Sequence, residues 1–203
     1  MEPLYDFRGR TLPVGTGLTA NAIVDGLLRL HAGKHHAKPV TIYVVGGNDP
    51  APISAVEAMM IAEVMRTVRS PLRTAGFGLL TGWLPLILAC GTVGQRYLLP
   101  HTLVSLSPPD WIHGLQKTVI GLHRSANEPA QQQTERLLQQ QHQELLAELK
   151  LPAKTFATHR ILSASAAIEA GIADHVVERK LTLETSIIRS LEPNKNNTHE
   201  NHI

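Results

Sequence analysis

The stretch Val40-Thr41-Ile42-Tyr43-Val44-Val45 gives the first indication of the fold class. Its β-branched and aromatic residues are typical of a buried strand, and Gly46-Gly47-Asn48-Asp49-Pro50 ends that strand in a loop. Beyond the loop, Ser54 predicts a helix N-cap, and Glu57 three residues later completes a capping box. A strand, a loop and a helix in succession predict an α/β unit.

The same alternation of strands and helices continues along the chain. Apolar spacing predicts helices over 20–31, 54–68, 131–149 and 163–170, and a buried helix after Gly82 that has Pro85 in its first turn. Further strands are predicted over 73–77, 97–99, 102–106 and 174–177. The 203 residues therefore predict one α/β domain.

Composition excludes several classes of protein. Hydrophobic residues make up 43% and charged residues 18%, which is enough apolar material for a full core. The 19 basic and 17 acidic residues leave a net charge of +2, which gives no support for nucleic-acid binding. Cys90 is the single cysteine, so an intramolecular disulfide framework and a cysteine zinc cluster are both excluded.

Targeting and membrane signals are weak. The first six residues carry acid early and have no apolar segment, so they do not predict a signal peptide. The most apolar window, 77–90, is shorter than the roughly 20 residues of a membrane-spanning helix and contains Pro85. We expect a soluble, cytoplasmic protein without a membrane partner. Residues 181–203 lose the apolar pattern and are predicted to form a polar, disordered tail.

Two further patterns suggest ligands but are better explained otherwise. His31, His35 and His36 lie close together, yet no carboxylate or cysteine cluster joins them, so a solvated helix end is expected rather than a metal site. Gly46-Gly47 is not followed by Gly-Lys-Ser/Thr, so it does not predict a phosphate loop. We expect neither a metal nor a cofactor.

Three blocks of sequence point together to one family. They are Gly91-Thr-Val-Gly-Gln-Arg-Tyr-Leu-Leu-Pro100, Ile161-Leu-Ser-Ala-Ser-Ala-Ala-Ile-Glu-Ala-Gly-Ile-Ala-Asp-His-Val-Val177 and, more weakly, 20–44. In order and spacing the chain resembles the proteolytic subunit of the Clp protease (ClpP) over about residues 8–180.

The resemblance implies a ClpP/crotonase-like α/β fold of repeated β-β-α units with a projecting handle helix. The expected division is a short N-terminal segment at 1–9, the ClpP-like domain at 10–180 with its handle region at about 108–160, and the tail. It also implies partners: other ClpP-like subunits in stacked rings of seven, and a AAA+ Clp unfoldase.

ClpP-like enzymes are serine proteases, so the resemblance also assigns positions to a Ser-His-Asp triad. Counted from the matching blocks, the nucleophile position falls on Gly82, the base on Ser107 and the carboxylate on His159. None of the three residue types is kept, which predicts a catalytically inactive subunit. Remnants of the oxyanion hole are expected at Gly46, Gly47 and Trp83.

Two enzymatic alternatives remain open. A relocated peptidase site could use Thr81 with His101, or Ser107 with His159. A crotonase-type acyl-CoA enzyme is the other alternative, and the Clp-type blocks disfavour it.

The handle helix is also expected to form the oligomer interface. An apolar stripe on a projecting helix marks a contact surface, and here it would meet the handle of a facing ring. The expected interface residues are Leu137, Leu138, Leu145, Leu146 and Leu149.

Overall fold

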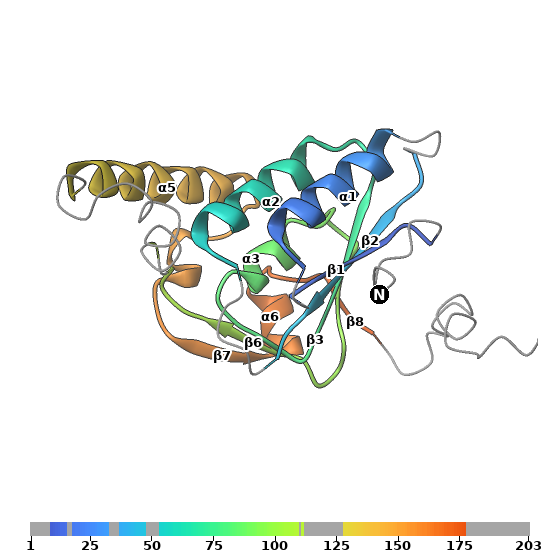
Figure 1. Ribbon diagram of the computed structural model, residues 1–203. Coiled ribbons are helices and arrows are strands. Elements are labelled where there is room, and N and C mark those ends of the chain that lie inside the picture. The colour runs from blue at the N-terminus through green and yellow to red at the C-terminus, as the bar shows by residue number, and fades with distance from the viewer. Residues whose placement is uncertain are drawn as a thin grey trace, which may run out of the picture.

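Two β-sheets with surrounding helices form the fold in the computed structural model, which describes residues 9–15, 18–32, 37–47, 53–109, 111 and 128–177. The larger sheet has the order β1-β2-β3-β5-β8 and is parallel throughout. The smaller sheet has the order β4-β6-β7, in which β4 and β6 run parallel and β7 runs antiparallel to β6. This mixed α/β architecture is the fold class predicted from the sequence, and Figure 1 shows its arrangement.

The elements have the following bounds. The strands are β1 Thr11–Val14, β2 Val40–Val45, β3 Leu72–Phe77, β4 Leu79–Leu80, β5 Arg96–Leu98, β6 Leu103–Leu106, β7 Arg160–Ser163 and β8 His175–Val176. The helices are α1 Ala20–Ala32, α2 Ala55–Thr67, α3 Leu84–Ala89, α5 Glu128–Glu148, α6 Ala164–Glu169 and the short 3-10 helix η1 Ala153–Phe156.

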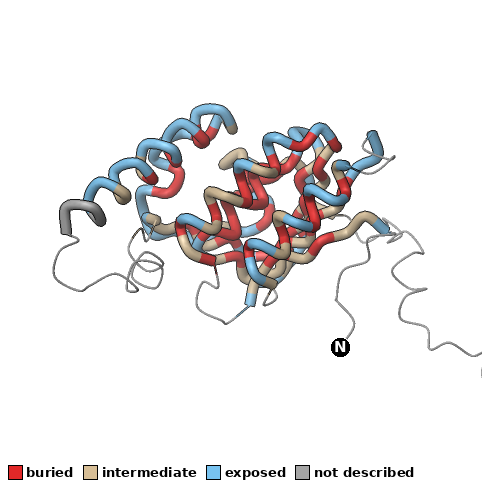
Figure 2. Tube along the Cα trace, turned by 45° about the horizontal axis from the view of Figure 1, so that its top comes forward, coloured by how far each residue is buried: buried red, intermediate tan, exposed pale blue. Residues whose placement is uncertain are grey.

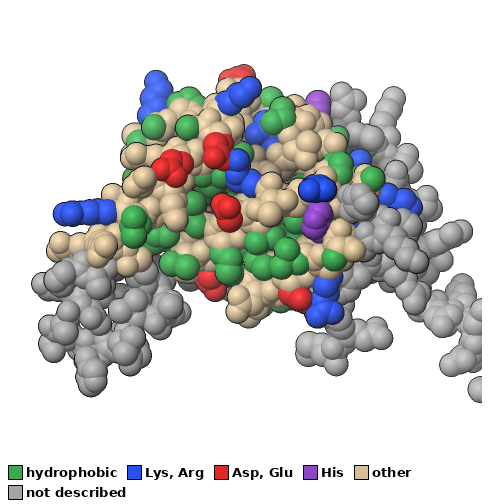
Figure 3. Space-filling view, turned by 90° about the horizontal axis from the view of Figure 1, so that it is seen from above, with side chains coloured by type: hydrophobic (Ala, Val, Ile, Leu, Met, Phe, Trp, Pro, Cys, Tyr) green, Lys and Arg blue, Asp and Glu red, His purple; other side chains and the backbone are tan. Residues whose placement is uncertain are grey.

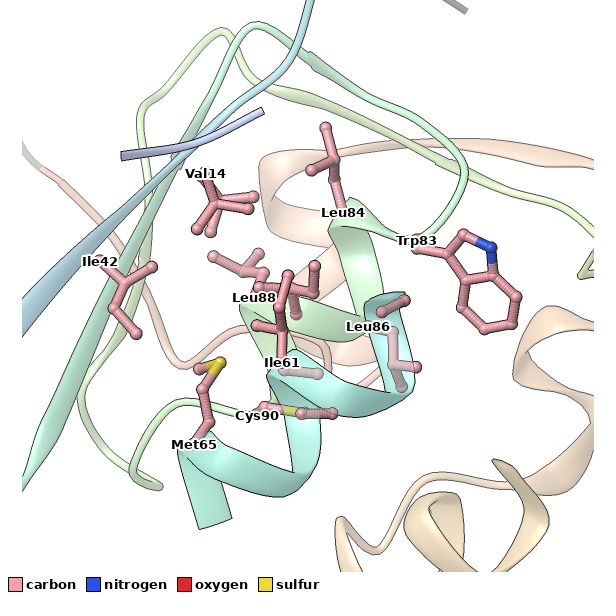
Figure 4. Packing of buried hydrophobic residues seen from close by; sticks show 14 of the residues in the cluster. Val14, Ile42, Ile61, Met65, Trp83, Leu84, Leu86, Leu88 and Cys90 are labelled. Carbon is pink, nitrogen blue, oxygen red and sulfur yellow. The ribbon is translucent and has the colours of Figure 1, made fainter. Parts of the chain in front are cut away.

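The core lies on one face of the larger sheet. Every second residue of β2 and β3 is buried there, and α1, α2 and α3 cover that face. All six residues of α3 are buried, and Pro85 occupies its first turn, as predicted. Figure 4 shows this packing, in which the side chain of Trp83 points away from the other labelled residues.

Helix α2 begins where the capping box was predicted. The Ser54 hydroxyl accepts a hydrogen bond from the Glu57 amide at 3.3 Å, and the Glu57 carboxylate accepts one from the Ser54 amide at 2.8 Å. Two otherwise unpaired amides of the first turn are thereby satisfied.

Helix α5 projects from the rest of the molecule (Figure 1), and Figure 2 shows exposed positions along most of its length. The exposure of the leucines in this region differs from the expected exposed stripe. Leu138, Leu145 and Leu146 are only 6%, 6% and 1% exposed, and Leu149 packs on the core as well. Leu137 alone among the five is open, at 53% exposure. The expectation of a fully exposed apolar stripe is therefore wrong. The rest of the described chain, which we call the head, covers most of these leucines.

Two surface properties follow from the described residues. None of the described helices is both long enough and apolar enough to cross a bilayer. On the face shown in Figure 3, acidic and basic side chains are interspersed rather than gathered by sign.

The predicted tail at 181–203 and most of the N-terminal segment lie outside the described residues.

Candidate functional site

The three positions that the resemblance assigns to a triad lie at one end of the smaller sheet. Gly82 follows β4, whose last residue Leu80 pairs with Val104 of β6. Ser107 directly follows β6, and His159 directly precedes β7. Because β6 and β7 are antiparallel, both of these residues leave the ladder at the same end.

Gly82 occupies a backbone conformation that suits glycine. Its φ of 58° lies in the left-handed region, and it sits in the turn that leads from β4 into α3. Glycine provides no nucleophile, so this position cannot form a covalent intermediate.

Ser107 and His159 are neighbours across the strands. The last pair of the ladder joins Leu106 to Arg160, and these two residues come next on either side. Side chains at such opposed positions are within reach of each other. Ser107 is half-buried and His159 exposed, and the described part of the chain shows no hydrogen bond between their side chains. The register of β6 and β7 therefore places this pair side by side at the end of the smaller sheet.

Thr81 and His101 are not brought together. Thr81 follows the last residue of β4, on the side of Gly82. His101 lies toward the other end of that strand, because its neighbour Thr102 donates a hydrogen bond to the Gly76 carbonyl at 3.1 Å and Leu103 donates one to Gly78 at 3.0 Å. This alternative for a relocated site has no geometric support.

The expected oxyanion-hole donors differ in their availability. The amide of Gly46 donates to the Phe77 carbonyl at 2.9 Å, so its hydrogen is already committed. A Cβ on Gly46 would collide with the Leu79 carbonyl oxygen, so the backbone is packed tightly there. The amides of Gly47 and Trp83 have no hydrogen-bond partner within the described residues. The Gly46 amide is therefore not available as an oxyanion-hole donor, whereas Gly47 and Trp83 stay predictions.

Four aromatic rings gather beside this end of the sheet. We call Trp83, Trp111, His142 and Phe156 the aromatic cluster. Centroid distances of 5.3 Å join Trp111 to Trp83 and to His142, and distances of 5.8 Å join His142 to Trp83 and to Phe156. All four contacts are edge-to-face, which is a favourable geometry for ring pairs.

Each ring stands near one assigned position or on the handle. Trp83 is next to Gly82, Trp111 follows the segment after Ser107, Phe156 precedes His159, and His142 belongs to α5. From the sequence, only Trp83 is expected at the site, and for its amide rather than its ring. No periodic pattern connects the other three, because they meet only through long-range packing.

His142 is the polar member of the aromatic cluster. It is 5% exposed, and its Nε2 has no hydrogen-bond partner within the described residues. Burial lowers the pKa of His142 to about 4, so the ring is neutral at pH 7.

The described residues contain no group of three metal-ligating side chains. His31 uses its Nδ1 to accept a hydrogen bond from the Arg69 amide at 3.3 Å, which ties the end of α1 to the segment after α2. His35 and His36 lie outside the described residues.

Comparisons with known proteins agree with the fold. A family model described as Clp protease matches residues 13–180. The proteolytic subunit 2 of the ATP-dependent Clp protease from Thermobifida fusca is 33% identical over 118 residues, covering 54% of this chain and 56% of the relative. The subunit of that name from Gloeobacter violaceus is 35% identical over 94 residues, covering 45% and 41%.

A third relative is matched over more of its length. The proteolytic subunit 2 from Streptomyces avermitilis is 28% identical over 193 residues, covering 90% of this chain and 92% of the relative. In the first two relatives, by contrast, the match spans only about half of their own length or less.

Proposed function

Since the chain belongs to the Clp protease family, we propose that it is a non-catalytic subunit with a structural or regulatory role in an ATP-dependent Clp proteolytic complex. The observation that carries the proposal is Gly82, in a left-handed turn at the position where the resemblance puts the nucleophile. A subunit without that side chain has no covalent route to peptide hydrolysis.

The two other assigned positions support the same proposal. Ser107 is a poor base at neutral pH, and His159 cannot supply the carboxylate that orients a catalytic imidazole. With Gly46 donating to Phe77, the expected oxyanion hole also has one donor fewer. Restoring one group alone would therefore not restore hydrolysis.

We further propose that the subunit assembles with ClpP-like subunits in stacked rings of seven and docks on a AAA+ unfoldase in the cytoplasm. The handle is the expected contact between rings. Because the head covers Leu138, Leu145 and Leu146, the contact would use the exposed side of α5 that carries Leu137.

Affinity purification from the native host tests this proposal. An epitope-tagged chain should copurify with at least one ClpP-like chain and a Clp ATPase in a species much larger than 22.2 kDa. A chain that purifies as a monomer, free of any ClpP-like subunit, would contradict the proposed role. An epitope-tagged Leu137→Glu chain serves as the matched control and should recover less of the partner.

One alternative function has a specific observation in its favour. Ser107 and His159 lie opposite each other next to the last pair of the β6–β7 ladder, as a nucleophile and its base must. A fluorophosphonate probe, which labels activated serines, distinguishes the two functions. The proposed role predicts no labelling; labelling that Ser107→Ala and His159→Ala each abolish, and that Thr81→Ala leaves intact, would establish a serine hydrolase.

A further inference from the structure

The handle helix α5 meets the head through the aromatic cluster. Trp83 comes from the start of α3, Phe156 from η1 and Trp111 from the segment after β6, while His142 is contributed by α5. His142 contacts all three of the other rings. It therefore lies at the centre of the contact between α5 and the head, which we call the joint.

Because His142 is buried in the joint, the stability of the joint depends on whether the His142 ring is charged. Trp83, His142 and Phe156 are 6%, 5% and 4% exposed, so little water reaches the imidazole. With Nε2 unpartnered among the described residues, an added proton would find neither a hydrogen-bond acceptor there nor solvent. A neutral ring fits the cluster, and an imidazolium is accommodated better once the joint has opened.

We propose that the aromatic cluster is a proton-operated latch, which holds α5 against the head while His142 is neutral and releases it when His142 is protonated. The inference does not depend on whether the subunit is catalytic, because it concerns only the joint between α5 and the head.

Charged groups on the surrounding elements do not change this conclusion. The described residues of α3 and of the segment 107–111 carry no charge, and η1 offers only the exposed Lys154. Helix α5 itself carries the half-buried Glu135, which accepts a hydrogen bond from Gln139 at 3.1 Å. It also carries the exposed residues Arg136, Glu144 and Glu148, the last paired with Arg66 of α2. None of them contributes to the lowered pKa of His142, for which burial is the cause among the described residues.

The size of the pH effect follows from linkage. In the open joint His142 has the ordinary pKa of 6.5, and in the closed joint its pKa is about 4. Between these values the open form binds more protons, so opening is favoured as the pH falls from 6.5 to 4. The opening equilibrium should rise by up to about tenfold per pH unit, and by about 20-fold at pH 5 relative to pH 7.

Tryptophan fluorescence of the unmodified chain can report the opening of the joint. It has two tryptophans, and both contact His142. Their emission therefore reports on the joint, and it shifts to longer wavelength when the rings separate and water reaches them. Hydrogen exchange of the α5 amides gives a second, independent measurement.

The experiment follows both signals in the full chain from pH 7.5 to pH 4.5. After correction for intrinsic exchange, the opening of the α5 amides should increase about 40-fold between pH 6.5 and pH 4.5, while the α1 amides stay unchanged. His142→Phe should abolish the emission shift and the accelerated exchange. His175→Phe is the matched control, because His175 contacts Tyr97 on the larger sheet and should leave both responses intact.

Two results would overturn the proposal. One is α5 exchange that follows the same pH dependence as α1, which means global rather than local opening. The other is a pH response that persists in His142→Phe. If that variant does not fold, the comparison of α5 with α1 in the unmodified chain still decides the matter.

Discussion

Arg96 and Asp174 form a two-point ion pair that joins the two sequence blocks on which the family resemblance mainly depends. Arg96 Nη2 donates to Asp174 Oδ1 at 2.6 Å, and Nε donates to Oδ2 at 2.9 Å. The same Oδ2 accepts from the amides of Gly94 and Arg96, at 2.8 and 3.0 Å. The side chains are 8% and 14% exposed, and the pair lies where β5 meets β8.

Breaking this pair should destabilise the domain substantially. Asp174→Asn leaves the Arg96 guanidinium buried without its counter-ion, so we expect the free energy of unfolding to fall by about 3 kcal/mol. Chemical denaturation followed by circular dichroism measures the loss. Asp25→Asn is the control, because its pair with Arg29 is 57% and 70% exposed and should be worth less than about 1 kcal/mol. Equal losses in both variants would contradict this view.

The same carboxylate should give the domain part of its acid sensitivity. Burial raises the pKa of Asp174, but hydrogen bonds from Arg96, its charge and the Gly94 amide outweigh burial and leave the pKa below its ordinary value. Its stabilisation is therefore present above about pH 4 and is lost as the pH falls through the lowered pKa. The stability gap between wild type and Asp174→Asn should be full at pH 7 and shrink below pH 4. A gap that stays constant down to pH 2 would show that Asp174 is not a titrating contributor.

Cys90 should be unreactive in the native protein. Its side chain is buried, and burial raises the pKa of the thiol to about 12, against smaller opposing effects of Arg66 and Arg96. The thiolate that attacks electrophiles is therefore almost absent at neutral pH. Iodoacetamide should modify Cys90 only after denaturation, as mass spectrometry would show. Rapid modification of the folded chain at pH 7.5 would contradict its placement.

Substitutions of two leucines in α5 should distinguish an effect on folding from an effect on assembly. Leu146→Ala removes a side chain that is 1% exposed, so it should lower the free energy of unfolding by about 2–5 kcal/mol. Leu137→Glu changes an exposed residue, so it should leave stability within about 0.5 kcal/mol but shift light scattering to smaller species. Leu28→Glu, on another exposed leucine at 48%, controls for the added charge. An unchanged molar mass in Leu137→Glu would remove α5 from the proposed interface.

Local patterns in the sequence predicted most of the fold, for identifiable reasons. The β-branched run of β2 and the capping box of α2 are decided by neighbouring residues, and both are confirmed. Strand β1 was missed because Pro13 cannot donate to a ladder. It is tolerated there because β1 is the edge strand of its sheet. Strand β7 was missed because it is largely exposed and shows no alternation of apolar and polar residues.

The surroundings of the site were less predictable. Positions assigned by the resemblance could be counted from nearby motifs, but the aromatic cluster depends on packing among four separate segments. The handle leucines show the same limit: periodicity predicted an apolar side of α5, yet it could not tell whether the chain's own head or another subunit covers it. Only the fold separates Leu146 from Leu137.

Hydrolysis of a fluorogenic peptide by the purified chain tests the proposed non-catalytic role most directly. The chain must be prepared free of host ClpP, and Ser107→Ala and Thr81→Ala should be measured beside it. Because Gly82 offers no nucleophile, we predict no turnover above the buffer rate in any of the three proteins, and none in Gly82→Ser, which still lacks a base and a carboxylate. Turnover by the unmodified chain that disappears in Ser107→Ala would contradict the account and establish a rebuilt active site.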